Sequence, residues 1–141
     1  MTNEELLKII KQAAKDGVTS FDLRNKRLTE LPPEIGQLTQ LTNLNLYNNQ
    51  LTVLPPEIGQ LTNLKILNLG GDWRDHNQLT ELPPEIGQLT QLTELYLFEN
   101  QLTTLPPEIG QLTQLTLLNL VSNQLTALPP EIGQLTQLTE L

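Results

Sequence analysis

One nine-residue string, LPPEIGQLT, recurs along this chain and constrains its fold more than any other feature. Its copies are spaced by 23, 28, 23 and 23 residues, and they begin at Leu31, Leu54, Leu82, Leu105 and Leu128. A fixed period of about 20 to 29 residues with leucine at set positions indicates stacked supersecondary units, because one such unit cannot bury its apolar face alone. The sequence therefore predicts a repeat solenoid.

Each repeat contains two kinds of segment. Leu95-Tyr96-Leu97 is typical of the first kind, in which apolar and variable residues alternate as in a strand with one buried face. The returning segment, for example residues 54–61, has prolines suited to a first helical turn and a glycine suited to ending it. We expect the strand segments to form a parallel β-sheet and the returning segments to form short helical or 3-10 convex turns. Asparagines that follow the strands should form a ladder that satisfies main-chain groups; they are Asn49, Asn77, Asn100 and Asn123.

The amino-terminal residues 2–16 predict an amphipathic helix. Thr2 and Glu5 form a capping box, and apolar residues recur at helical spacing. Such a helix can cover the first repeat of a solenoid. We divide the chain into a capping helix, 1–17, and repeats, 18–141, which include a divergent first repeat 18–40, an insertion 70–76 and a truncated last repeat 138–141.

The pattern LxxLxLxxNxLxxLPxxIGxL runs from about residue 18 to the end and resembles the leucine-rich repeat family. Its 23-residue LPxxIGxL form is similar to repeats of the Ras-suppressor and Scribble group and of bacterial Roco GTPases. The resemblance implies an α/β horseshoe whose concave sheet binds other proteins. The first repeat departs from the pattern because Lys26 replaces the ladder asparagine, as is ordinary for a terminal repeat.

The charge is unevenly distributed. The formal net charge is −8, yet all eight Lys and Arg lie at or before Arg74, where they balance eight Asp and Glu. The remaining eight acidic residues follow without any Lys or Arg. This disfavours nucleic acid and membrane surfaces as partners, because phosphates require clustered cations. The acidic residues either serve solubility or form a docking surface for a basic partner.

Composition also limits catalysis. The chain has no cysteine, one histidine and only Ser20 and Ser122 as serines, so a nucleophile with an orienting base is hard to assemble. We expect no enzyme and no cofactor. The lack of cysteine fits a reducing compartment, and the amino terminus has no long apolar run, so we predict a cytoplasmic protein.

The insertion 70–76 contains residues of metal-ligating type, Asp72, Asp75 and His76. These ligands are few and the loop is short, so we predict no metal site. Arg74 should instead form solvated ion pairs with the two aspartates. Gly70 should leave a notch between Tyr47 and Phe98, toward which Trp73 is long enough to fold.

The variable positions of the strands supply a candidate binding surface. Equivalent positions of neighbouring strands form rows across a sheet, and these rows bring exposed aromatic and aliphatic residues together. Exposed aromatics rimmed by polar residues mark interaction surfaces, although aromatics also suit strands by propensity alone. The predicted partner-binding residues are Tyr47, Asn48, Ile66, Asn68, Trp73, Tyr96, Phe98, Glu99, Leu117, Asn119 and Val121.

The function predicted from these features is a non-catalytic protein–protein interaction module that binds a protein or peptide on its concave face. Two alternatives stay open: a regulatory or signalling-scaffold segment of a larger protein such as a bacterial Roco-like GTPase, and an engineered, consensus-like array. The last segment, 138–141, stops within a strand. We therefore expect either further repeats or self-association through the uncapped carboxyl-terminal edge.

Overall fold

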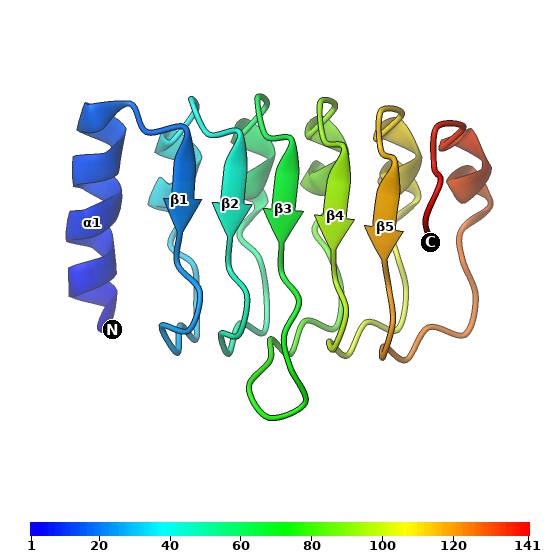
Figure 1. Cartoon of the computed structure of the whole chain (residues 1–141), viewed down its shortest axis with the longest axis horizontal. Coiled ribbons are helices and arrows are strands. Elements are labelled where there is room, and N and C mark those ends of the chain that lie inside the picture. Colours follow the sequence, from blue (N-terminus) through cyan, green and yellow to red (C-terminus); the bar gives the residue numbers. More distant parts are fainter.

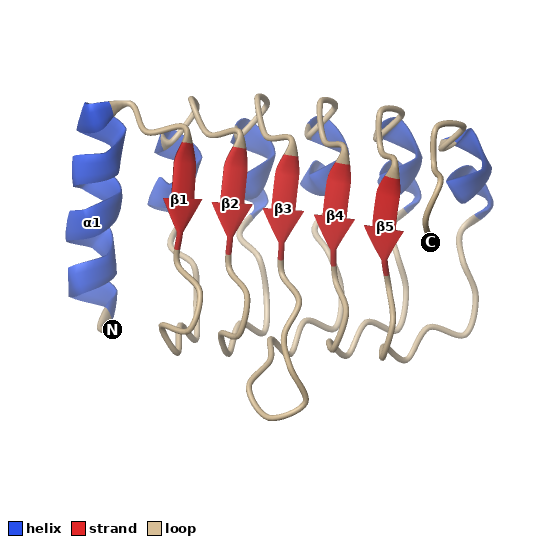
Figure 2. Cartoon of the chain, viewed as in Figure 1, coloured by secondary structure: helices blue, strands red, loops and turns tan.

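The computed structural model describes all 141 residues and shows a repeat solenoid (Figures 1 and 2). Five parallel strands lie side by side in chain order, each paired with the next. A 3-10 turn follows each strand and returns behind the sheet. The helix and strands are α1 (Asn3–Asp16), β1 (Ser20–Asp22), β2 (Asn43–Asn45), β3 (Ile66–Asn68), β4 (Glu94–Tyr96) and β5 (Leu117–Asn119). The turns are η1 (Pro33–Gln37), η2 (Pro56–Gln60), η3 (Pro84–Gln88), η4 (Pro107–Gln111) and η5 (Pro130–Gln134).

Helix α1 covers the first end of the solenoid (Figure 1). Its predicted capping box is confirmed: Glu5 N–H donates to the Thr2 hydroxyl at 3.2 Å, and Thr2 N–H donates to the Glu5 carboxylate at 2.8 Å. Gly17 ends the helix at φ 60°, a left-handed conformation that glycine adopts without steric cost. The apolar face of the helix is buried against the repeats through Leu6, Ile10 and Ala13.

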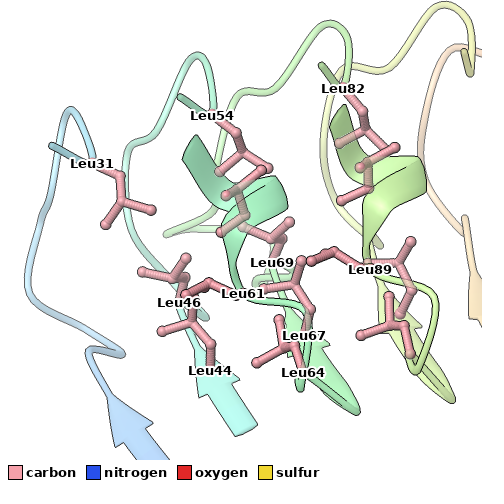
Figure 3. Close-up of a cluster of buried hydrophobic side chains, with 14 of the residues drawn as sticks. Leu31, Leu44, Leu46, Leu54, Leu61, Leu64, Leu67, Leu69, Leu82 and Leu89 are labelled. Carbon is pink, nitrogen blue, oxygen red and sulfur yellow. The ribbon is translucent and has the colours of Figure 1, made fainter. Parts of the chain in front are cut away.

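The core lies between the sheet and the 3-10 turns, where each repeat contributes leucines to one continuous cluster (Figure 3). Leu44 and Leu46 from the second repeat and Ile58 and Leu61 from the following turn are all buried members of this cluster. Prolines precede and begin each turn, where a helix leaves its first N–H groups without an internal partner anyway. Turn η5 and the segment 138–141 pack against a neighbouring repeat on one side only, and Leu128 and Leu141 are 39% and 64% exposed.

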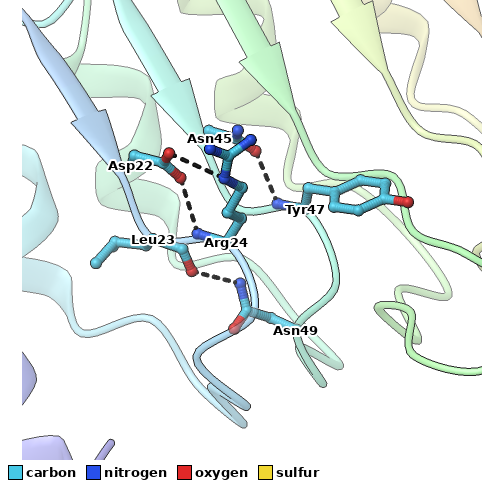
Figure 4. A network of polar contacts seen from close by, with 6 residues as sticks. All are labelled: Asp22, Leu23, Arg24, Asn45, Tyr47 and Asn49. Atoms are coloured by element: carbon cyan, nitrogen blue, oxygen red, sulfur yellow. Dashed lines mark hydrogen bonds and ion pairs between the residues drawn. The ribbon is translucent and has the colours of Figure 1, made fainter.

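The asparagine ladder is confirmed. Asn49 is buried and donates to the carbonyls of Leu23 and Leu46, both at 2.9 Å, while its Oδ1 accepts from Leu28 N–H at 3.0 Å (Figure 4 shows the Leu23 bond). Each ladder amide therefore joins its own repeat to the preceding one. The same role falls to Asn77, Asn100 and Asn123. The asparagine side chains thus add hydrogen bonds to main-chain groups between repeats, beyond those that the short strands supply.

Candidate functional site

The register of the sheet aligns the variable positions into rows. Asn45, Asn68, Tyr96 and Asn119 are successive partners in one row, and Asn43, Ile66, Glu94 and Leu117 are partners in the row beside it. Side chains at these positions point away from the leucine core, because strand residues alternate between faces. We call this side of the sheet, together with the residues directly after each strand, the sheet face.

Three aromatic residues meet on the sheet face, and we call Tyr47, Tyr96 and Phe98 the aromatic cluster. The rings of Tyr47 and Phe98 lie 6.1 Å apart between centroids and are tilted by 48°. Tyr96 meets Phe98 edge to face at 6.4 Å, a favourable arrangement for aromatic pairs. Tyr47 follows β2 and Phe98 follows β4, two strands that lie roughly 10 Å apart by strand spacing, so the two side chains point toward each other.

Gly70 makes this convergence of the rings possible. A Cβ atom on Gly70 would lie 2.6 Å from Phe98 Cζ, so any larger residue would displace the ring. The predicted notch exists, but Phe98 fills it rather than Trp73. The expectation that Trp73 folds toward Gly70 is wrong, since Trp73 is 73% exposed and packs instead against the guanidinium of Arg74, 4.4 Å from the ring centroid.

The insertion is held by hydrogen bonds rather than by ion pairs. Asn48 exchanges two bonds with Asp72: its Nδ2 donates to the carboxylate at 3.1 Å, and its Oδ1 accepts from Asp72 N–H at 2.7 Å. The Asp72 carboxylate also accepts from the N–H groups of Arg74 and Asp75. These main-chain donors, that of Asp75 first, lower the pKa of Asp72 below its ordinary value. Arg74 forms no salt bridge, so the predicted ion pairs are wrong.

The hydroxyl group of Tyr96 makes a hydrogen bond on the sheet face. Its Oη donates to the Glu94 carboxylate at 2.7 Å, which raises the pKa of Tyr96 to about 12, with burial adding to the effect. Sequence reasoning did not select Glu94. The available signal was its position two residues before Tyr96, which places both side chains on the same face of one strand.

We predict that Glu94→Ala returns the pKa of Tyr96 toward the ordinary 10.0, because it removes both the acceptor and the nearby negative charge. The measurement is a spectrophotometric titration of phenolate absorbance, with Tyr96→Phe used to identify the Tyr96 component. Since the folded pKa is raised, the stabilisation from this pair is fully present below pH 10.0 and is lost as the pH rises toward about 12. An unchanged Tyr96 titration in the Glu94 variant would contradict the assignment.

The other predicted contact residues differ in how available they are. Ile66 and Leu117 are half-buried on the sheet face, whereas Val121 is 65% exposed. Asn48 is buried, and its side-chain amide is hydrogen-bonded to Asp72. It therefore stabilises the insertion and does not present its amide to a partner. Glu99 has a left-handed φ of 54°, which turns the chain at the end of its strand. Asn68 and Asn119 each accept a main-chain hydrogen bond and lie in the central row.

A shallow hollow of about 200 Å³ lies beside Tyr96. Its lining includes Asp22 from β1, Asn45 from β2, and Ile66 and Asn68 from β3. The aromatic cluster and this hollow together give the sheet face an apolar part and a polar part.

No group of three His, Asp or Glu side chains converges in a way that could hold a metal ion. No helix is long and apolar enough to cross a membrane.

Comparisons with known proteins agree with this architecture. The family model described as Leucine rich repeat matches residues 16–72 and 75–125, so it leaves out two residues of the insertion. No curated protein matches the sequence. Among solved structures, a leucine-rich repeat protein of Leptospira interrogans is similar over 96% of this chain and 39% of its own, with 43% identity and a TM-score of 0.74.

Two further solved structures extend the comparison. An internalin, InlF, from Listeria monocytogenes is 30% identical, with a TM-score of 0.73, over 90% of this chain and 35% of its own. The ectodomain of the Arabidopsis thaliana membrane receptor kinase GASSHO1/SCHENGEN3, solved in complex with CASPARIAN STRIP INTEGRITY FACTOR 2, is 36% identical, with a TM-score of 0.64, over 79% of this chain and 13% of its own. This chain therefore spans 39% and 35% of the lengths of the first two proteins, and none of the matches singles out the Ras-suppressor or Roco subtype.

Proposed function

This chain belongs to the leucine-rich repeat family, and from that premise we propose that it is a non-catalytic module that binds a protein partner on its sheet face. The observation that carries the proposal is the aromatic cluster. Tyr47, Tyr96 and Phe98 lie at variable positions, outside the leucine framework, yet they converge on one another beside Gly70. The complex formed by the Arabidopsis ectodomain supports a binding role for this architecture.

Packing within the repeats does not account for the cluster. The leucine core is continuous without it, because the aromatic side chains lie on the opposite side of the sheet from the core. Tyrosine and phenylalanine offer large contact areas at small entropic cost, and such residues dominate the energetics of protein interfaces. Glu94 and Glu99 lie next to the cluster, and no Lys or Arg follows Arg74 in the sequence. We therefore propose a partner that presents basic residues near β4 and β5.

The test is capture of a partner from a lysate of the source organism, followed by titration of the identified protein. We expect Tyr96→Ala with Phe98→Ala to weaken binding at least about 30-fold, the effect of losing roughly 2 kcal/mol at an interface hot spot. Val53→Ala is the matched control, because Val53 is 55% exposed but lies outside the sheet face. Undiminished binding by a folded double variant would refute the site.

Two narrower proposals follow from the same fold. The exposed Leu141 and the bridge between Leu117 and Glu140 leave a sheet edge that a second copy could pair with. We propose self-association at this edge, and light scattering that reports a monomer at high concentration would count against it. A cytoplasmic location is also a proposal, and the absence of cysteine is what supports it.

A further inference from the structure

The central row of the sheet face contains amide groups whose orientation is fixed. Asn45 Oδ1 accepts from Tyr47 N–H at 3.1 Å (Figure 4), Asn68 Oδ1 accepts from Gly70 N–H at 3.0 Å, and Asn119 Oδ1 accepts from Val121 N–H at 3.1 Å. Because a main-chain N–H needs an acceptor, the atom that faces it must be the oxygen. The Nδ2 group of each asparagine is therefore turned away from this bond, and none of the three donates to another group of the protein.

The fold itself does not require these donors. In the first repeat, Asp22 occupies the same row and makes the same bond, in which its Oδ1 accepts from Arg24 N–H at 3.1 Å (Figure 4). A carboxylate oxygen therefore accepts this main-chain N–H of the turn as well as an amide oxygen does. Asparagine at the three later positions adds N–H donors on the sheet face, and the turn does not need these donors. Acceptors for these Nδ2 donors must therefore come from outside the chain.

The spacing of the row indicates which acceptors fit. Neighbouring strands lie about 4.8 Å apart, so three intervals separate Asn45 from Asn119 by roughly 14 Å. In an extended polypeptide, carbonyls on one side recur every two residues, about 6.8 Å, so two such repeats also span roughly 14 Å. A segment that crosses the strands can therefore place the carbonyls of residues i and i+4 at Asn45 and Asn119. The carbonyl of residue i+2 then lies between Asn68 and Tyr96.

We propose that the partner contributes an extended peptide segment that crosses the sheet along this row, and that the amides of Asn45, Asn68 and Asn119 donate to its main-chain carbonyls. Side chains of the segment alternate about its axis. Those directed toward the carboxyl ends of the strands meet the aromatic cluster, and one directed toward the hollow beside Asn68 finds room in its 200 Å³. This inference rests on the proposed function and names the form of the partner.

The experiment uses linear peptides selected on the intact chain from a displayed random library and titrated by calorimetry. Asn68→Asp keeps the acceptor of the turn, as Asp22 demonstrates, but removes the donor. The matched control is Gln91→Glu, which converts an amide to a carboxylate at an exposed position before β4, outside the sheet face. We expect Asn68→Asp to weaken the selected peptide about tenfold more than the control does, and the triple variant with Asn45→Asp and Asn119→Asp to weaken it at least about hundredfold.

Thermal unfolding of the variants shows whether the fold survives the substitutions. Equal affinities of the Asn68→Asp and Gln91→Glu variants would overturn the proposal. Failure of the library to yield any peptide would also overturn it, since the partner would then not be an extended segment. If the peptide loses binding to the Tyr96→Ala, Phe98→Ala protein but binds the triple aspartate variant normally, the sheet face remains the site and only carbonyl recognition fails. The two proposals are therefore tested separately.

Discussion

Replacing Asn77 with alanine is expected to lower the free energy of unfolding by about 3 kcal/mol, which is large against the total stability of a small domain. Asn77 is fully buried at the centre of the ladder. Its Oδ1 accepts from Leu51 N–H at 3.0 Å, and its Nδ2 donates to the carbonyls of Leu46 and Leu69, both at 3.0 Å. Alanine leaves these main-chain groups without partners in a leucine core that excludes water, so each retains its full desolvation cost.

The matched control is Asn123→Ala, near the end of the array. Asn123 makes equivalent bonds to Leu102, Leu97 and Leu120, but it is only half-buried, so water can replace its amide. We expect it to cost about 1 kcal/mol. Urea unfolding followed by circular dichroism and by Trp73 fluorescence measures both variants, and agreement of the two probes shows whether the array still unfolds as one unit. Equal losses at the two positions would contradict the burial argument.

The framework of the fold was predictable because every repeat supplies the same information. The leucine positions, the ladder asparagines and the proline turns recur at fixed offsets, so each expectation was supported several times over by the sequence. Residues at variable positions occur once each. Their alignment into rows follows from the repeat register, and the structure confirms that alignment for Ile66, Glu94 and Leu117. What a variable side chain then contacts depends on neighbours one or two strands away.

Phe98 and Trp73 show why side-chain placement was harder to predict. Both were expected near Gly70, but only one ring can occupy the space that glycine leaves, and Phe98 reaches it from an adjacent strand. The position of Trp73 depends on the loop, which Asp72 shapes by accepting main-chain hydrogen bonds and by pairing with Asn48 from the previous repeat. Nothing within the insertion sequence identifies that partner. Arg74 likewise stacks on Trp73 instead of pairing with a carboxylate.

The glycines of the 3-10 turns lead to the second large expected effect. A Cβ atom on Gly87 would lie 2.7 Å from the main-chain carbonyl oxygen of Glu108 and 2.6 Å from Gln111 Oε1, both in the next repeat. The glutamine side chain can move, but the carbonyl belongs to a packed turn and cannot move without shifting its repeat. We therefore expect Gly87→Ala to destabilise the array by about 3 kcal/mol, at the upper end of overpacking costs.

Gly133 is the control for this prediction because it occupies the same position in the last turn. No atom lies within 4 Å of a Cβ placed there, and its φ is not in the left-handed region. Gly133→Ala should therefore leave stability unchanged or raise it by about 0.5 kcal/mol, because alanine restricts the unfolded chain more than glycine does. Urea unfolding of the two variants measures the difference directly. If both alanines are tolerated, the turns do not interlock through glycine, and the close stacking of the repeats must depend on the leucine core and the asparagine ladder alone.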